Sequence, residues 1–462
     1  MSVHGPLGAD PGAVQFRART IGTRRSALRD RAGAVGIAGL LVTTLLIALA
    51  AANTDQLLPE SVRPLPRWLA GPFGSTGLDL GSGGLIVVLV AMFGSYVLAA
   101  HAAERLSART VLMCIAAMHA LVLLAPPLLS TDVFSYQFYG RMGEVYGANP
   151  YLAGPHALAL DPLFPYIGAK WSYTPTVYGP LFTAISYAFA PLSIAASALS
   201  YKAIAALSSI GTVALVWNAA RLRGIDPVKA AALVGLNPLI VIYGVGGGHN
   251  DLLMMLIVVA SIYLMLANRV RSASALTVTA AAIKLTGGLM LPFAIASGGA
   301  RRAMSRRRDV LIGAGLAAAT IAAVSFALFG LGPTHLLGTI QKVQSEGDWH
   351  SIPGFIGTKI GLPTVAHVIS WLLAAAFAAV FVWLVRRVWR GQLDWIDAAG
   401  WAAAALLLTA SSLLPWYVVW LIPLAALASD RRLWRVAIVM TGVIQAIQLL
   451  GYIPHIGGAS AS

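Results

Sequence analysis

The chain has 462 residues, of which 58% are hydrophobic and only 11% are charged, and its mean hydropathy is +0.77. A soluble globular chain carries about 25% charged residues, so this composition excludes a soluble domain and indicates a membrane protein with several spans. The net charge of +15 lies in short clusters between apolar runs, which is typical of cytoplasmic loops and argues against nucleic-acid binding. Strands of alternating polarity are absent, so the spans are predicted to be helices. The single Cys114 excludes a disulfide framework or a cysteine-based metal site.

The first part of the chain predicts a basic tail and three helices. Residues 1–32 are polar and rich in arginine, which predicts a disordered tail on the cytoplasmic side. Apolar runs at 34–52, 80–103 and 111–129 are each close to the length of about 20 residues that a bilayer requires. This parity places the polar segment after residue 129 on the outer side of the membrane.

A long aromatic and proline-rich loop, residues 130–179, follows the third helix. Because tyrosine and tryptophan favour the membrane interface, we predict one or two short surface helices within it. The next apolar run, 180–192, is too short to span, whereas 201–220 is long enough. We predict that the short run enters the membrane without crossing it, because this keeps the basic segment at 221–229 on the cytoplasmic side.

The middle of the chain contains a predicted hairpin within the membrane. Residues 230–244 are predicted to run outward as a helix to the sequence GVGGGHND, and residues 252–267 to return. The apolar run 275–297 is interrupted by IKLTGG and has basic residues on both flanks, so we predict two short helices with Lys284 near the bend. Broken helices at membrane depth usually line a water-filled cavity.

The remaining segments alternate between the two sides of the membrane. A second polar outer loop is predicted at 332–363, and a C-terminal tail at 451–462. Further spans are predicted at 310–331, 365–385, 396–411, 415–427 and 436–450. The result is one all-α polytopic membrane domain over residues 33–450, with about 11–13 transmembrane helices, some of them short or broken. No internal repeat is visible, which argues mildly against a transporter of inverted-repeat design.

The most informative residue is Asp132, which lies just beyond the third helix in the run STDVFSYQFYGRMGEVYGANPY, residues 130–151. A carboxylate at the membrane edge is costly unless it is hydrated or functional. Asp132 could simply cap the N-terminus of a following helix, as Thr131 also could. The tyrosines and charged residues around it favour a catalytic role, in which Asp132 is the general base that deprotonates a hydroxyl group.

Other residues on the predicted outer face could complete a site for a phosphate-linked sugar. Cations stabilise a departing phosphate as its charge develops, and the candidates are Lys284, His249 and Arg141. Aromatic faces and polar groups could bind the sugar or its acceptor, and the candidates are Tyr136, Glu144, Asp161, Tyr178, Trp416 and Tyr417.

The cationic candidates also have simpler interpretations. Lys284 could extend its ammonium group to the membrane interface, and His249 could be a polar residue in a glycine-rich turn. Arg141 could pair with Glu144 three residues later as an ordinary surface pair. Asp251 more readily caps the helix that follows it than binds a metal.

The aromatic and acidic candidates have alternatives as well. Trp416 and Tyr417 could be interface anchors, which is the common role of such residues near a membrane surface. A divalent metal, Mg or Mn, held by Asp132 and Asp161 is left open, because two distant carboxylates are weak evidence for a metal site.

Five segments, taken together and in order, resemble a known family. They are DVFSYQFYGRM…GANPY (132–151), TPTVYGPLF (174–182), LNPLIVIYGVGGGHND (236–251), a lysine in a broken helix (Lys284) and LLPWYVVWLIPLAAL (413–427). The set resembles the polyprenol-phosphomannose-dependent α-1,6-mannosyltransferases of mycobacteria and corynebacteria, in the glycosyltransferase C (GT-C) superfamily. The similarity covers about residues 34–450, and the ordered set is more specific than any one segment.

The resemblance implies a GT-C fold and an inverting enzyme. It would transfer mannose from a polyprenyl-phosphate-mannose donor to an α-1,6-mannan or lipomannan-type acceptor. The enzyme would lie in the plasma membrane, with the N-terminus cytoplasmic and the active site on the outer face. The family's catalytic Asp lies in the first long outer loop, which matches Asp132. Many superfamily members have two adjacent acidic residues there, but this chain has Thr131-Asp132, so a second carboxylate would have to come from elsewhere.

Two other functions stay open at this point. A transporter or flippase of polyprenyl-linked sugars would explain a cavity and cations without any chemistry. An enzyme of the same class could also use another sugar, such as arabinose or glucose.

Overall fold

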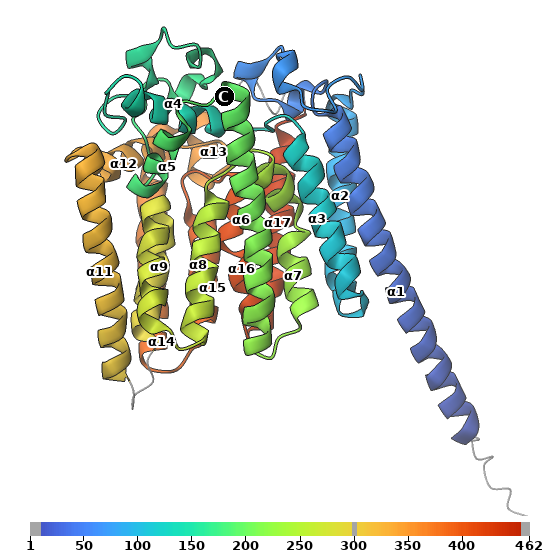
Figure 1. The fold of residues 1–462 in the computed structure, drawn as a ribbon. Helices are drawn as coiled ribbons and strands as arrows, with labels where there is room; N and C mark the ends of the chain where they lie inside the picture. The colour runs from blue at the N-terminus through green and yellow to red at the C-terminus, as the bar shows by residue number, and fades with distance from the viewer. Residues whose placement is uncertain (1–10, 298–302, 454–462) are drawn as a thin grey trace, which may run out of the picture.

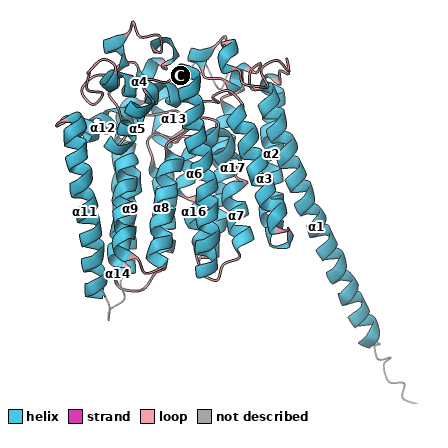
Figure 2. Ribbon diagram, viewed as in Figure 1, coloured by secondary structure: helices cyan, strands magenta, loops and turns pink. Residues whose placement is uncertain are grey.

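The computed structural model describes residues 11–297 and 303–453, and the side chains of these except 11–30 and 303. The described residues form helices, turns and loops and contain no β-strand (Figures 1 and 2), which confirms the all-α prediction. Helices satisfy every internal backbone hydrogen bond within one segment, and for that reason they form so readily in apolar stretches such as these.

The helices are as follows. In chain order they are α1 (Pro11–Ala50), α2 (Gly81–Ala102), α3 (Ala108–Leu124), α4 (Asp132–Glu144), α5 (Pro180–Phe189), α6 (Ile194–Leu222), α7 (Pro227–Gly235), α8 (Asp251–Leu266), α9 (Val270–Ile283), α10 (Met290–Ala296), α11 (Ala303–Phe329), α12 (Leu336–Glu346), α13 (Ile352–Thr358), α14 (Pro363–Trp389), α15 (Trp395–Thr409), α16 (Ile422–Leu427) and α17 (Arg431–Leu450).

Six helices in the described part of the chain are long and apolar enough to span a membrane by themselves. A bent pair, Pro227–Gly235 with Leu239–Val245, makes a seventh if it is counted as one span. The predicted number of 11–13 spans is reached only when shorter apolar helices, such as α3, α8, α9 and α15, are counted with these.

The bundle has two ends of different character. The short helices α4, α5, α12 and α13 gather at the top of Figure 1, which we call the site end. The α6–α7 and α8–α9 connections and the start of α1 lie at the opposite end, which we call the basic end because it carries Arg223, Lys229 and Arg269. Helix α6 runs between the two ends, whereas α5 stays at the site end. The short run 180–192 therefore does not cross, as predicted.

Helix α1 begins at Pro11, well before the predicted start at residue 34, so much of the predicted disordered tail is helical. Residues 12–33 contain no proline and are rich in alanine and arginine, which favour a helix that continues from the apolar span. Residues 1–10 of that tail lie outside the described residues, as do residues 454–462 of the predicted C-terminal tail.

The predicted helix at 230–244 is broken instead of continuous. Helix α7 ends at Gly235, and a π-helical segment, Leu239–Val245, continues at an angle of 47° to it. Pro238 has no N–H group, and the Asn237 side chain accepts hydrogen bonds from the N–H groups of Leu239 (3.0 Å) and Ile240 (3.2 Å). Proline and a local asparagine turn therefore end α7 here.

The predicted hairpin around Lys284 is confirmed. Helix α9 ends at Ile283, Lys284 has an extended backbone (φ −150°, ψ 131°), and a 3₁₀ turn, Leu285–Leu289, leads into α10. A Cβ atom added to Gly287 would lie 2.8 Å from the backbone carbon of Ala280, so this turn folds back onto α9 with no room for a side chain. The chain then returns to the basic end before α11 begins (Figure 1).

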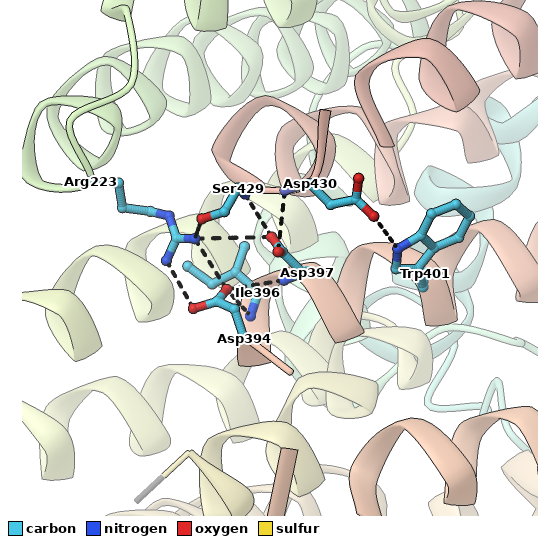
Figure 3. A network of polar contacts seen from close by, with 7 residues as sticks. All are labelled: Arg223, Asp394, Ile396, Asp397, Trp401, Ser429 and Asp430. Carbon is cyan, nitrogen blue, oxygen red and sulfur yellow. Dashed lines mark hydrogen bonds and ion pairs between the residues drawn. The ribbon is translucent and has the colours of Figure 1, made fainter. Parts of the chain in front are cut away.

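At the basic end, Arg223 joins three parts of the bundle (Figure 3). Arg223 directly follows α6. Its guanidinium group donates hydrogen bonds to Asp394, the N-cap of α15, at 3.1 and 3.3 Å, and to the Ser429 hydroxyl at 2.7 Å. The Asp397 carboxylate accepts from the N–H groups of Ser429 (2.7 Å) and Asp430 (3.2 Å) just before α17. We call this network the basic-end clamp. It holds α6, α15 and α17 together on the side of the bundle away from α4.

Candidate active site

Asp132 is the first residue of α4, at the site end. Its carboxylate oxygen Oδ2 accepts hydrogen bonds from the Tyr136 hydroxyl (3.2 Å), one helical turn later, and from His249 Nδ1 (3.0 Å). The N-cap residue, Thr131, makes no side-chain cap, and the Asp132 carboxylate is bound by Tyr136 and His249 instead. The capping interpretation of Asp132 therefore does not describe what its carboxylate does.

His249 is held on both sides. Its ring stacks on Trp416, with the ring centroids 3.5 Å apart and an angle of 15° between the planes. The His249 side chain is fully buried, whereas the Asp132 side chain is 14% exposed. Of these two residues, Asp132 is thus the one that a substrate can reach. The buried His249 orients the Asp132 carboxylate through their hydrogen bond.

Lys284 belongs to a second cluster. Its ammonium group donates to Asp251 Oδ2 at 2.8 Å, and the Trp420 indole N–H donates to the other oxygen of the same carboxylate, also at 2.8 Å. The Lys284 nitrogen lies 5.0 Å from the ring centroid of Tyr417, which itself stacks on Trp420. Asp251 is fully buried, and its carboxylate holds Lys284 instead of capping α8.

The two clusters adjoin each other, and their charges interact. Trp416 and Tyr417 are consecutive residues whose rings meet edge to face, 6.0 Å apart. Burial by itself would raise the pKa of the Asp132 carboxyl, but the charge and hydrogen bond of His249, the Lys284 charge and the Tyr136 hydrogen bond hold this pKa below its ordinary 3.8. Asp132 is therefore ionised at neutral pH and able to accept a proton.

Tyr178 supports this site through aromatic packing. Its ring packs edge to face against Tyr136 at 4.8 Å, and Phe182 and Tyr201 pack against the same tyrosine. Tyr178 is 6% exposed, and Tyr136 is fully buried. These rings fix the Tyr136 hydroxyl, which also accepts a hydrogen bond from the Asn250 N–H at 3.3 Å.

Arg141 and Asp161 lie elsewhere in the loop and bind each other. Arg141 donates twice to Asp161 Oδ2, at 2.9 and 2.7 Å, and the Tyr146 hydroxyl donates to the same oxygen at 2.7 Å. Burial would raise the pKa of Asp161, but these bonds and the Leu163 N–H hold it below its usual range. Glu144 is exposed at the end of α4 and does not form the Arg141 pair that its spacing suggested.

A metal site built from Asp132 and Asp161 is not formed. The Asp161 oxygens are bound by Arg141, Tyr146 and the Leu163 N–H, whereas Asp132 is bound by Tyr136 and His249. Within residues 11–297 and 303–453, His, Cys, Asp and Glu side chains nowhere form a group of three that could hold a metal ion.

Lys202 in α6 is a residue that the sequence interpretation missed. Its side chain is 1% exposed, and its ammonium group donates to the carbonyl oxygens of Val122 (2.9 Å), Pro126 (3.0 Å) and Ala125, where α3 ends. It also packs against Gly248, beside His249. Lys202 therefore joins the two chain segments that lead to Asp132 and His249. A lysine within an apolar span was itself a signal that could have identified it.

Replacing Lys202 by methionine is expected to lower the melting temperature of the purified protein. The change leaves three buried carbonyl groups without their donor, and a single buried unsatisfied group costs about 1–3 kcal/mol. Thermal unfolding in detergent, followed by tryptophan fluorescence, measures the effect. The matched control is Lys229→Met, which removes an exposed pair with Glu104 that is worth little. Equal melting temperatures for the two variants would contradict the role given to Lys202.

Comparison with known proteins places the chain among relatives of one kind. A family model described as "Alpha-(1->6)-mannopyranosyltransferase, N-terminal domain" matches residues 31–298, and one described as "MptB C-terminal domain" matches residues 350–451. No solved structure matches significantly.

Individual relatives agree with these models. An alpha-(1->6)-mannopyranosyltransferase of Mycobacterium tuberculosis is 29% identical over 71% of this chain and 66% of its own length. Alpha-(1->6)-mannopyranosyltransferase A of the same organism is 30% identical over 76% of this chain and 71% of its own length. Alpha-(1->6)-mannopyranosyltransferase B of Corynebacterium glutamicum is 28% identical over 67% of this chain and 57% of its own length. The matches thus span about two thirds of the length of these relatives.

Proposed function

Because this chain belongs to the alpha-(1->6)-mannopyranosyltransferase family, we propose that it is a membrane mannosyltransferase that takes mannose from a polyprenyl-phosphate-mannose donor. The acceptor is an α-1,6-mannan or lipomannan-type glycan, and Asp132 is the general base. Transfer inverts the anomeric carbon and takes place on the outer face of the plasma membrane, with the N-terminus on the cytoplasmic side.

The observation that carries this proposal is the meeting of an ionised carboxylate and a cation at the site end. Asp132 is oriented by His249 and is partly open, and Lys284 lies beyond Trp416 and Tyr417. A glycosyl transfer with inversion needs a base on one side of the sugar and a stabilised leaving group on the other. Asp132 and Lys284 supply these two functions.

The proposed step is a single displacement. The acceptor hydroxyl oxygen forms a bond to the anomeric carbon while the bond from that carbon to the phosphate oxygen breaks. The hydroxyl proton moves to the Asp132 carboxylate, and the bonding electrons leave with the phosphate. The Lys284 ammonium group stabilises the charge that develops there. Lys284 is 18% exposed, so a phosphate can reach it while its bond to Asp251 is kept.

An apolar cavity beside Lys284 supports a lipid-linked donor. It is lined by side chains of α8, α10, α15 and α16. Thr286, Gly287 and Trp420 are among its lining residues, and Trp420 donates a hydrogen bond to Asp251, so the cavity lies next to the Lys284–Asp251 pair. A phosphate at Lys284 would therefore leave an attached isoprenoid chain in apolar surroundings.

The proposal is tested with the purified protein in lipid nanodiscs, labelled polyprenyl-phosphate-mannose and a short α-1,6-mannoside. The expected result is label in a longer oligosaccharide with a new α-1,6 linkage, identified by linkage analysis. A parallel assay places the protein in sealed vesicles. Labelled donor that only moves from one leaflet to the other, with no transfer to the mannoside, would instead identify a flippase. Transfer from an arabinosyl or glucosyl donor, but not from the mannosyl donor, would overturn the choice of sugar.

Removing His249 is expected to shift the pH dependence of the reaction. Asp132 must be deprotonated to act, and His249 helps to hold the pKa of Asp132 below 3.8, so the acidic limb of the wild-type pH profile is expected at low pH. His249→Gln removes the charge that counteracts the effect of burial on the Asp132 carboxyl, so the pKa of Asp132 rises. As the pH is lowered, kcat/KM is therefore expected to fall off at a higher pH than in the wild type. The control is His156→Gln, which changes an exposed histidine in the loop 130–179. An unshifted acidic limb in His249→Gln would contradict this coupling.

A further inference from the structure

The loop between α11 and α14 carries a second carboxylate–imidazole pair at the site end. Asp348 Oδ1 accepts a hydrogen bond from His350 Nδ1 at 2.6 Å, and the backbone N–H of His350 donates to the same oxygen at 3.3 Å. Both side chains are partly open, with exposures of 16% for Asp348 and 17% for His350. The pair comes from a different loop than Asp132.

This pair is fixed in position by its backbone. The Asp348 N–H donates to the carbonyl oxygen of Ser411 at 3.3 Å, and the Ser351 hydroxyl donates to the same carbonyl at 2.6 Å. Ser351 is also the N-cap of α13, where its side chain accepts from the Gly354 N–H at 3.0 Å. Because Ser411 lies a few residues before Trp416, these bonds fasten the pair to the segment that stacks on His249.

The charges of the two clusters interact. The Tyr417 phenol lies within the electrostatic influence of Lys284, Asp132 and Asp348 together. The charge of Lys170, from the first outer loop, also acts on Asp348. Burial by itself would raise the pKa of the Asp348 carboxyl, but the hydrogen bond and charge of His350 hold it below its usual range. The Asp348 carboxylate is therefore part of the electrostatic surroundings of Tyr417.

The chemistry of this position selects one class of ligand. The Asp348 carboxylate has no hydrogen-bond donor to offer a phosphate group, whereas the Lys284 ammonium group has, so we place the lipid phosphate at Lys284. A carboxylate accepts hydrogen bonds readily from hydroxyl groups, and an aromatic ring such as the adjacent Trp349 can cover an apolar sugar face. Trp349 is partly buried and lies against the His350 ring, 4.0 Å away.

We propose that Asp348 and His350 form the binding site for the hydroxyl groups of the acceptor mannoside, with Asp348 as the hydrogen-bond acceptor and His350 as the residue that orients it. This inference rests on the proposed function and adds to it the place of the second substrate. The acceptor chain lies between the two outer loops, and its terminal hydroxyl is directed at Asp132.

The test compares Asp348→Asn with Glu346→Gln in the nanodisc assay. Both variants lose one carboxylate from the same loop, but Glu346 is exposed. Asp348→Asn is expected to raise the KM for the acceptor by about tenfold or more, because a hydrogen bond to a charged group is lost. Its KM for the donor and its kcat at saturating acceptor are expected to stay within about twofold of the wild type. Glu346→Gln is expected to match the wild type in all three quantities.

A second variant separates binding from folding. His350→Gln keeps a hydrogen-bond donor near Asp348 and is expected to raise the acceptor KM by a smaller factor, while both variants keep the wild-type melting temperature. An unchanged acceptor KM in Asp348→Asn, or equal rises in the donor and acceptor KM, would overturn the inference. If the wild type itself transfers no mannose to any acceptor, the proposed function fails instead, so the two failures are distinct.

Discussion

The Asp132→Asn variant is expected to lose mannosyl transfer by about 10²–10⁴-fold, which is the usual contribution of a general base. Asparagine keeps the size of the side chain and an oxygen that can accept from Tyr136 or His249, so the fold and the donor site should survive. Donor affinity, measured by binding of labelled polyprenyl-phosphate-mannose, is expected to stay within about threefold of the wild type. The measured quantity is the rate of label transfer to the α-1,6-mannoside.

The control for this variant is Asp55→Asn. Asp55 is an exposed carboxylate in the loop between α1 and α2. The change therefore removes one negative charge, as Asp132→Asn does, but leaves the Asp132–His249 contact intact. Its activity is expected to equal that of the wild type. Retained turnover in a folded Asp132→Asn protein would rule out the role of base and would direct attention to the buried His249.

The Lys284→Met variant is expected to lose both activity and stability. Methionine removes the cation proposed to stabilise the leaving phosphate, and the loss of one such electrostatic group typically costs about 10²–10³-fold in rate. It also leaves the fully buried Asp251 carboxylate without its partner. Removing one member of a buried ion pair costs about 3–5 kcal/mol of stability. Transfer assays and thermal melts measure the two effects separately.

A double variant divides these two effects. Lys284→Met/Asp251→Asn removes both charges, and asparagine can still accept the hydrogen bond from the Trp420 indole. Its melting temperature is expected to recover most of what Lys284→Met loses, whereas its transfer rate stays low. If the double variant regains activity together with stability, Lys284 acts only as the partner of the Asp251 carboxylate, and the phosphate must be bound by another group.

The sequence predicted the topology well because charge and length are local properties. The 180–192 run was too short to cross, and the clusters around Arg223 and Arg269 required a common side, which together placed His249 on the side of Asp132. The break at Lys284 was visible as two glycines and a lysine in an apolar run. The break at Asn237 was missed because proline in a membrane helix often only bends it, so its presence alone does not predict an end.

The site was predicted less completely, because side-chain pairing depends on distant segments. Asp132, His249 and Lys284 are recognisable singly, but nothing local indicates that Asp251, 33 residues before Lys284, is its partner. Arg141 was predicted to contact a phosphate or a sugar, with a surface pair to Glu144 as the alternative, yet its partner is the buried Asp161. In a helix of this loop, tertiary contacts outweigh the small energy of a surface pair.

The basic-end clamp has a mechanical consequence for the three helices that it joins. Arg223 and its carboxylate partners pin three helices at one extremity, away from Asp132. Helices that are joined at one end can move apart only at the other end. Any separation of these three helices is therefore expected at the site end, near Asp132, while the basic end stays closed.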